Sequence, residues 1–179
     1  VERGVAVLSG ADAFGHDPAA DPDVVLQVFA AMARTGCTLS RDTEERLLHA
    51  LPLVSAHVEE GPALWQHLQQ ILTGPYAGSA LRAMHALGVL ELLVPEFHGI
   101  DALVIRDAYH RYTVDEHTFV LIDTLHGLET AQKGPMAEWA ARFGGVMREL
   151  QHPGLLYLAA LMHDTGKGRS GGDHAPRRG

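Results

Sequence analysis

The sequence of 179 residues predicts an all-α fold. Apolar residues recur at helical spacing in one segment after another, and most of these segments begin or end at a proline, a glycine or a capping residue. No two strand-like runs lie close enough together to form a hairpin. Residues 89–94 are the one run too short for periodicity to assign. We therefore expect helices throughout the chain.

Capping residues mark the first two helices. The first is expected to begin at Pro22, with Asp21 as its N-cap, and to end at Gly36. The second is expected to begin at Ser40, and Pro52 should end or kink it because proline lacks a backbone donor. The predicted inward residues are Val24, Val25, Val28, Phe29 and Met32 in the first helix, and Leu47, Leu48, Leu51, Val54 and Val58 in the second.

Two shorter helices follow. Gly61 and Pro62 mark the start of the first, and Ser79 is expected to cap the second, which ends near Gly88. Residues 98–112 are expected to form an irregular connection. The apolar positions of the two helices are Leu64, Leu68, Ile71 and Leu72, then Leu81, Met84 and Leu87.

A helix carrying a histidine on its first turn is expected next. Residues 113–116 have the Thr-x-x-Glu form of a capping box. The predicted apolar stripe consists of Val114, Leu121, Leu125 and Leu128. At 100° per residue His117 falls beside this stripe, so we expect it to lie inward or at the rim. Asp115, Asp123 and His126 point elsewhere, and His126 is expected to be solvated.

Two further helices are predicted after residue 133. Gly134 and Pro135 begin one of them. Its expected inner face is Met136, Trp139, Ala140, Phe143, Val146, Met147 and Leu150. Residues 155–162 carry no charge on any side, which is typical of a helix that is buried all round.

Composition excludes several classes of protein. The net charge of −8 disfavours nucleic-acid binding, because counterion release requires an excess of lysine and arginine. No apolar run reaches the roughly 20 residues that cross a bilayer, and residues 1–4 carry no signal-peptide pattern. The single cysteine, Cys37, excludes an internal disulfide and fits a reducing cytoplasm. The missing initial methionine suggests a piece of a longer protein.

A His-Asp dipeptide follows the uncharged helix. A chain with 12 histidines contains roughly one such dipeptide by chance, and this sequence contains two. His16 and Asp17 lie in a predicted loop, and no other potential metal ligand is expected near them, so we discard this pair as the chance occurrence. His163 and Asp164 lie at the predicted end of a buried helix, where burial and fixed rotamers can hold two potential metal ligands in place. The sequence therefore points to the second pair.

The residue types near this pair suit metal-dependent phosphoester hydrolysis. Such a divalent ion needs imidazole and carboxylate ligands with open positions for water and a substrate oxygen, and His117, His163 and Asp164 could supply three ligands. Lys167 could face a phosphate, and His174 could serve as a second-metal ligand or as an acid for the leaving group. Mg²⁺ or Mn²⁺ suits this ligand set best, although imidazole also admits Fe, Zn or Ni.

Each of these residues also has an ordinary structural interpretation. His117 could be a hydrogen-bonded core histidine, and His163 with Asp164 could be a hydrogen-bonded pair at a helix end. Lys167 could be a solvated charge favourable to the helix dipole, and His174 a residue of a tail. Spacing alone leaves these alternatives open.

Three motifs in order resemble one family. They are Tyr-Thr-Val-Asp-Glu-His-Thr at residues 112–118, the run that leads through His-Asp to the lysine at residues 155–167, and Gly-Gly-Asp-His at residues 171–174. Together they are similar to the HD-type hydrolase domain of the bifunctional uridylyltransferase/uridylyl-removing enzymes. The upstream segments 81–90 and 94–97 are similar to the helices that precede that domain, and the resemblance covers roughly residues 22–175.

The resemblance implies a role for each site residue. His117 corresponds to the first metal histidine, and His163 with Asp164 to the signature pair. Lys167 corresponds to the lysine after the pair, and His174 to the histidine of the Gly-Asp-His segment. The implied reaction is hydrolysis of uridylyl-tyrosine on the nitrogen-signalling protein PII, with UMP as product.

The resemblance also implies the domain organisation. Residues 1–97 would be a helical connector that follows a nucleotidyltransferase domain, and residues 98–179 the first helices of an HD domain truncated at its C-terminus. The transferase domain, the final aspartate ligand and the ligand-sensing ACT domains of the family have no counterpart here, so the isolated chain is expected to be one ligand short. The alternatives are another HD phosphohydrolase, the HD part of a tRNA nucleotidyltransferase, and a non-catalytic helical binding module.

Overall fold

The computed structural model describes residues 22–100 and 113–166, and within them every regular element is helical. The elements are α1 (Pro22–Thr35), α2 (Arg41–His57), α3 (Pro62–Leu72), α4 (Ala77–Ala86), α5 (Val89–Leu93), the 3₁₀ helix η1 (Pro95–Gly99), α6 (Val114–Thr130), α7 (Ala137–Glu149) and α8 (Pro153–Met162). The all-α prediction is confirmed.

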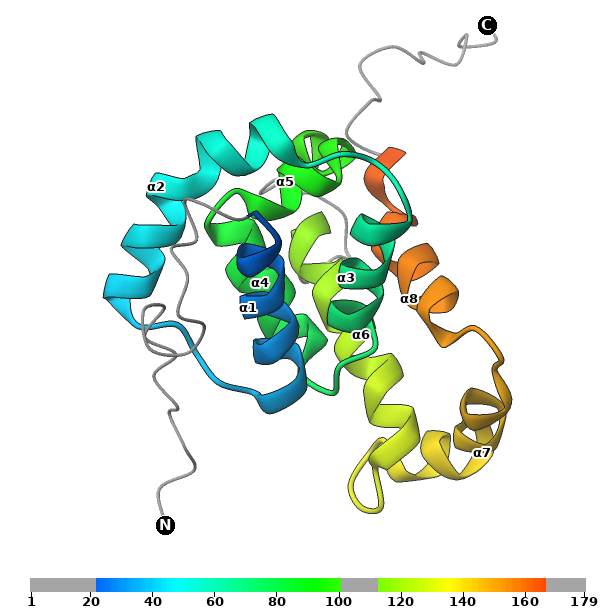
Figure 1. Cartoon of the computed structure of the whole chain (residues 1–179). Helices are drawn as coiled ribbons and strands as arrows, with labels where there is room; N and C mark the ends of the chain where they lie inside the picture. Colours follow the sequence, from blue (N-terminus) through cyan, green and yellow to red (C-terminus); the bar gives the residue numbers. More distant parts are fainter. Residues whose placement is uncertain (1–21, 101–112, 167–179) are drawn as a thin grey trace, which may run out of the picture.

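Helix α1 lies at the centre of the bundle. It packs against α2, α3 and α4, and Figure 1 shows α3 beside it and α4 behind it. The predicted stripe is buried, and so are residues on its other faces, such as Leu26 and Ala33. The helix ends as predicted at Gly36, whose φ of 73° lies in the left-handed region and whose amide donates to the Met32 carbonyl at 2.8 Å. Asp21 lies outside the described residues.

Helix α2 begins as predicted but does not end at Pro52. The Ser40 hydroxyl accepts a hydrogen bond from the Thr43 amide at 3.2 Å. The helix continues through Pro52 to His57. The amide that Pro52 lacks would bond to the carbonyl of Leu48, which is exposed rather than inward as predicted. The loss of that bond therefore falls on the solvent side of the helix.

The start of α4 is set by contacts with α1 rather than by a cap. Tyr76 donates its amide to the Ala33 carbonyl at 2.8 Å, and α4 begins directly after it. A Cβ on Gly74 would lie 2.6 Å from the same carbonyl, so only glycine allows this approach. Ser79 consequently lies inside the first turn, and the prediction that it caps α4 is wrong. The ambiguous run at 89–94 forms α5 and the residue that follows it.

The predicted inner face of α7 is only partly covered. Trp139 is 53% exposed, and Val146 and Leu150 are exposed too, whereas Met147 is buried. Helix α7 packs against α6 and projects from the rest of the bundle (Figure 1). Periodicity identified the apolar stripe correctly, but it could not show whether the described part of the chain covers that stripe.

Helix α8 is buried on one side only. Tyr157, Ala160 and Leu161 are buried against α3 and α6. Leu155 and Ala159 face away and are exposed, so the expectation of burial all round is wrong. An uncharged sequence permits a helix to be buried on every side, but the number of helices packed against it determines which sides are buried.

One apolar core joins the two predicted domains. Its buried residues run from Val25 in α1 to Leu161 in α8. The domain boundary at residue 97 stays a prediction. Among the described helices, none is long and apolar enough to cross a membrane.

Two aromatic substitutions test this packing. Phe29→Ala removes a fully buried ring from α1 and should lower the free energy of unfolding by about 3–5 kcal/mol. Trp139→Ala should lower it by about 1 kcal/mol or less, because this ring is 53% exposed and stacks on Phe143 of the same helix. Urea denaturation of both variants measures the difference. Equal costs would show that α7 is more deeply packed than the structure indicates.

Candidate metal centre

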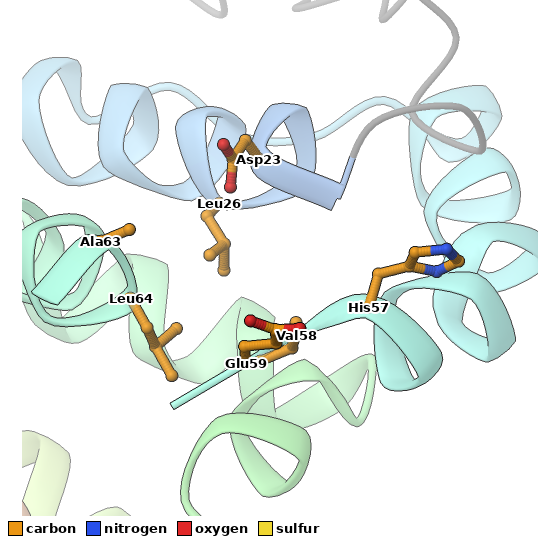
Figure 2. A pocket seen from close by; sticks show the side chains of 7 residues that line it. All are labelled: Asp23, Leu26, His57, Val58, Glu59, Ala63 and Leu64. Carbon is orange, nitrogen blue, oxygen red and sulfur yellow. The ribbon is translucent and has the colours of Figure 1, made fainter. Parts of the chain in front are cut away.

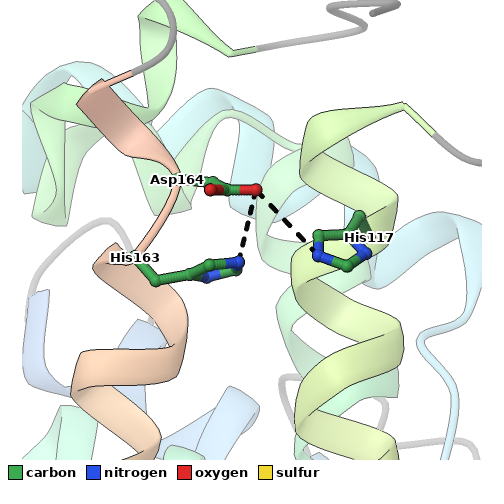
Figure 3. Close-up of side chains that lie close together, drawn as sticks. All are labelled: His117, His163 and Asp164. Carbon is green, nitrogen blue, oxygen red and sulfur yellow. Dashed lines mark ion pairs between the residues drawn. The ribbon is translucent and has the colours of Figure 1, made fainter. Parts of the chain in front are cut away.

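Two helices distant in sequence bring three possible metal ligands together. His117 lies on the first turn of α6. His163 and Asp164 follow the last residue of α8, which packs against α6. The three side chains point toward one another across the gap between these helices (Figure 3). The structure thus brings together the predicted ligands, while metal binding itself stays a prediction.

The ligand atoms lie close enough to share an ion. His163 Nε2 is 3.2 Å and His117 Nε2 is 4.0 Å from the same oxygen, Oδ2 of Asp164. One ligand atom from each residue lies within 4.8 Å of the other two. Neighbouring ligands of an ion with bonds of about 2.1 Å are about 3.0–3.4 Å apart, so a small inward movement would bring all three atoms within bonding distance of one ion.

Hydrogen bonding fixes the orientation of the His163 ring. Its Nδ1 lies 2.7 Å from the Ala160 carbonyl, which can only accept, so Nδ1 carries a proton and donates it. Nε2 is thereby directed at the Asp164 carboxylate. A second proton or a cation would satisfy both the ring nitrogen and the carboxylate. Metal-binding histidines are commonly held by such a bond from the other ring nitrogen.

Burial increases from the imidazoles to the carboxylate. The side chains of His117 and His163 are 44% and 32% exposed, whereas that of Asp164 is 10% exposed. Directly after Asp164, the Thr165 hydroxyl donates to the Met162 carbonyl at 2.9 Å and so ties the chain back to the end of α8. The Asp164 carboxylate therefore forms the buried end of the centre, and the two imidazoles form its accessible rim. These nitrogen and oxygen donors fit a divalent cation.

The remaining predicted site residues lie outside the described part of the chain. These are Lys167 and His174, together with the discarded pair His16 and Asp17. Their roles stay as the sequence predicts them.

A separate pocket lies between α1, the end of α2 and α3. It has a volume of about 160 Å³, and Figure 2 shows its seven lining side chains. Its polar groups, on Asp23, His57 and Glu59, do not converge on one point in that view. None of the lining residues belongs to the metal centre.

Contacts from α4 hold the first turn of α6, and the sequence did not reveal them. Glu116 was expected to complete a capping box, but Thr113 makes no capping hydrogen bond and Glu116 binds Arg82 instead, with Oε1 2.6 Å from Nη2. Asp115 Oδ2 lies 3.2 Å from His85 Nε2. The capping-box prediction is wrong because a charged partner 34 residues away competes with the local bond.

The environment of Asp115 favours its ionised form. Burial acts to raise the pKa of this carboxyl. Hydrogen bonds from the Thr113 hydroxyl and from backbone amides, together with the charge of His85, outweigh burial and hold the pKa below its usual value. On its other side, His85 Nδ1 contacts Glu91. His85 therefore lies between two carboxylates and links α4 to α5 and α6.

His126 is partly buried rather than solvated, contrary to prediction. Its Nε2 donates to the Leu72 carbonyl at 2.9 Å, and its Nδ1 lies 3.1 Å from the Tyr157 hydroxyl. The two rings stack at 4.3 Å, and the same hydroxyl reaches Glu129 at 3.2 Å. Burial lowers the pKa of His126 and raises that of Tyr157. This contact fastens α8 to α6 some distance from the metal centre.

Comparisons with known proteins point consistently to one family. The chain is 30% identical to the bifunctional uridylyltransferase/uridylyl-removing enzyme of Rhodospirillum rubrum over 175 residues, which are 98% of this chain and 18% of that protein. It is 36% identical to the enzyme of the same name from Thiobacillus denitrificans over 167 residues, 88% of this chain and 19% of that protein. For Pseudomonas savastanoi the identity is 45% over 98 residues, 53% of this chain and 10% of that protein.

The chain thus spans less than a fifth of the length of these curated relatives. No family model matches the chain, and no solved structure matches it.

The burial of His126 predicts a pH-dependent contact between α6 and α8. Its folded pKa lies below the ordinary value of 6.5, so the unfolded chain binds more protons and stability falls as the pH drops below that value. His126→Gln keeps a donor for Leu72 but does not titrate, so its free energy of unfolding should fall less between about pH 7 and pH 5. Denaturation at several pH values measures this difference, with His49→Gln at an exposed position of α2 as the control. Parallel curves for the parent and His126→Gln would contradict the assignment.

Proposed function

This chain belongs to the family of bifunctional uridylyltransferase/uridylyl-removing enzymes, as one segment of them, and from that premise we propose that it carries the metal centre of the uridylyl-removing reaction. The observation that supports the proposal is the convergence of His117, His163 and Asp164. Neither the nucleotidyl-transfer step nor its site is assigned to this chain.

The proposed reaction is hydrolysis of a phosphodiester. The substrate is the uridylylated form of PII, in which UMP is joined to a tyrosine hydroxyl. A water oxygen forms a bond to phosphorus, the bond from phosphorus to the tyrosine oxygen breaks, and a proton passes to the leaving oxygen. The products are UMP and unmodified PII. We place the reaction in the cytoplasm, where the single buried cysteine, Cys37, needs no disulfide partner.

His117, His163 and Asp164 would hold a divalent ion, with Mg²⁺ or Mn²⁺ as the proposed metals. When bound, such an ion lowers the pKa of a coordinated water and offsets negative charge on phosphoryl oxygens. Asp164 contributes a buried negative charge at the inner end of the centre. The hydrogen bond from His163 Nδ1 to the Ala160 carbonyl keeps His163 Nε2 available as a ligand. Lys167 is proposed to face the phosphate, and His174 to protonate the leaving oxygen or to bind a second metal ion, because these side chains suit those tasks.

The exposure of the centre favours a protein substrate. Both imidazoles lie at an accessible rim, with their side chains 44% and 32% exposed. Sites that recognise small molecules usually bury most of the ligand surface. A tyrosine on the surface of a folded protein needs an open approach, and this rim provides one. The net charge of −8 disfavours the alternative of a tRNA substrate.

Metal binding by the 179-residue chain tests the centre directly. Mn²⁺ should raise the melting temperature of the parent, since a ligand that binds the folded state stabilises it. His163→Ala removes one of three ligands and should weaken Mn²⁺ binding by at least about 100-fold. His57→Ala, in the separate pocket, serves as the matched control and should bind Mn²⁺ like the parent. Unchanged binding by His163→Ala would remove the site assignment.

The proposed reaction requires the full-length enzyme. Asp164→Ala leaves the imidazoles without their shared carboxylate, so UMP release from uridylylated PII should fall by at least about 100-fold. Transfer of UMP to PII by the same variant should continue, because that step is assigned to another part of the enzyme. Undiminished UMP release would rule out Asp164 as a ligand of the hydrolytic centre.

A further inference from the structure

Helix α4 contacts α6 immediately beside the proposed metal ligand His117. The two residues that precede His117 are both held from α4. Arg82 binds Glu116 through Nε, at 3.1 and 3.0 Å from its two oxygens, and through Nη2 at 2.6 Å. His85, also on α4, holds the other residue, Asp115, with its Nε2 3.2 Å from Oδ2. The first turn of α6, which lacks a capping bond from Thr113, is therefore fixed by side chains of α4.

Arg82 also reaches a second point on α6. Its Nη1 lies 2.8 Å from Oδ2 of Asp123, which is seven residues beyond Glu116. Seven residues are close to two helical turns, so both carboxylates lie on one face of α6. Gly78 on α4 makes room for this contact, because a Cβ at that position would overlap the Asp123 carboxylate. The guanidinium thus bridges two turns and fixes both the rotation and the axial position of α6.

The bridge is partly shielded from water. The side chains of Arg82 and Glu116 are 34% and 37% exposed, and the guanidinium also lies 5.6 Å from the centre of the buried Phe119 ring. Planar, bidentate pairing of this kind restricts geometry more than a single point contact does. The arrangement is suited to setting a position rather than only adding stability.

Small errors in that position matter at the metal centre. The ring of His117 projects roughly 6 Å from the helix axis, so a rotation of about 10° would move its Nε2 by about 1 Å. Metal-ligand distances tolerate deviations of about 0.2 Å. A helix free to rotate even slightly would therefore present His117 at the wrong distance for much of the time.

We propose that Arg82 is a positioning residue for the metal centre, which holds His117 in register with His163 and Asp164 through Glu116 and Asp123. This inference rests on the proposed function, because it requires that these three residues bind a cation. Arg82 is not itself a ligand. Its effect on metal affinity passes through the placement of α6.

The sign of the effect separates positioning from simple electrostatics. Arg82→Met removes a positive charge near a cation site, and Coulomb's law alone predicts tighter binding of a divalent ion. Positioning predicts the opposite. We expect Arg82→Met to weaken Mn²⁺ binding by about 10- to 100-fold, as is common when a group that orients a ligand is lost. Titration calorimetry of the 179-residue chain, well below the melting temperature of each variant, measures the affinity.

Two further variants complete the experiment. Arg41→Met removes an exposed arginine that pairs with Glu45 on α2, and it should leave Mn²⁺ affinity within about twofold of the parent. Arg82→Lys keeps the charge but loses the fork that bridges two carboxylates, so its affinity should fall between those of the parent and Arg82→Met. If Arg82→Met does not fold, Arg82→Lys alone carries the test.

The outcomes distinguish this inference from the proposed function. Loss of binding in His163→Ala together with parent-like or tighter binding in Arg82→Met would overturn the positioning role and leave the centre in place. Parent-like affinity in Arg82→Lys, where that variant carries the test, would overturn it equally. Unchanged binding in His163→Ala would overturn the centre itself.

Discussion

The placement of α6 between α4 and α8 is the constraint on which the proposed metal centre depends. Buried residues such as Phe119 and Ile122 hold α6 in the core, but apolar burial is non-directional and restrains rotation and axial shift less sharply than a directional contact does. Charged and polar contacts supply what burial lacks. Arg82 fixes one flank through two carboxylates, and Tyr157 fixes the other through His126. Hydrophobic packing brings the helices together, and directional contacts set their register.

Features that depend on a few neighbouring residues could be predicted from the sequence. Ser40 caps α2 and Gly36 ends α1, because each acts on amides or carbonyls within four residues along the chain. The position of His117 at the rim beside the apolar stripe of α6 followed from helical periodicity, and the position of His163 and Asp164 from the end of an uncharged run. Even their meeting was accessible as a hypothesis, because it required only that two helices pack side by side.

Features that depend on distant partners could not be predicted. Glu116 fits a capping box perfectly well by sequence, yet Arg82, 34 residues away, binds it more strongly. His126 has a polar position on its own helix and is partly buried because Tyr157 stacks on it from another. Trp139 shows the converse error: its stripe is apolar, but the described helices leave much of it exposed. In each case the pattern was identified correctly, and the three-dimensional neighbour decided the outcome.

The contacts between α6 and α8 would also connect the proposed metal binding with pH. The proposed centre joins these helices at one end, and the pair of His126 and Tyr157 joins them nine residues further along α6, about 13 Å away by the rise of a helix. Imidazoles bind metal only when neutral, so acid weakens the first connection by competition. Acid weakens the second because His126 is held uncharged by burial. Loss of the proposed metal ion and a drop in pH would therefore act on the same two helices, at opposite ends. Because metal adds stability only while the folded state binds it, the contribution of His126 is isolated in metal-free protein.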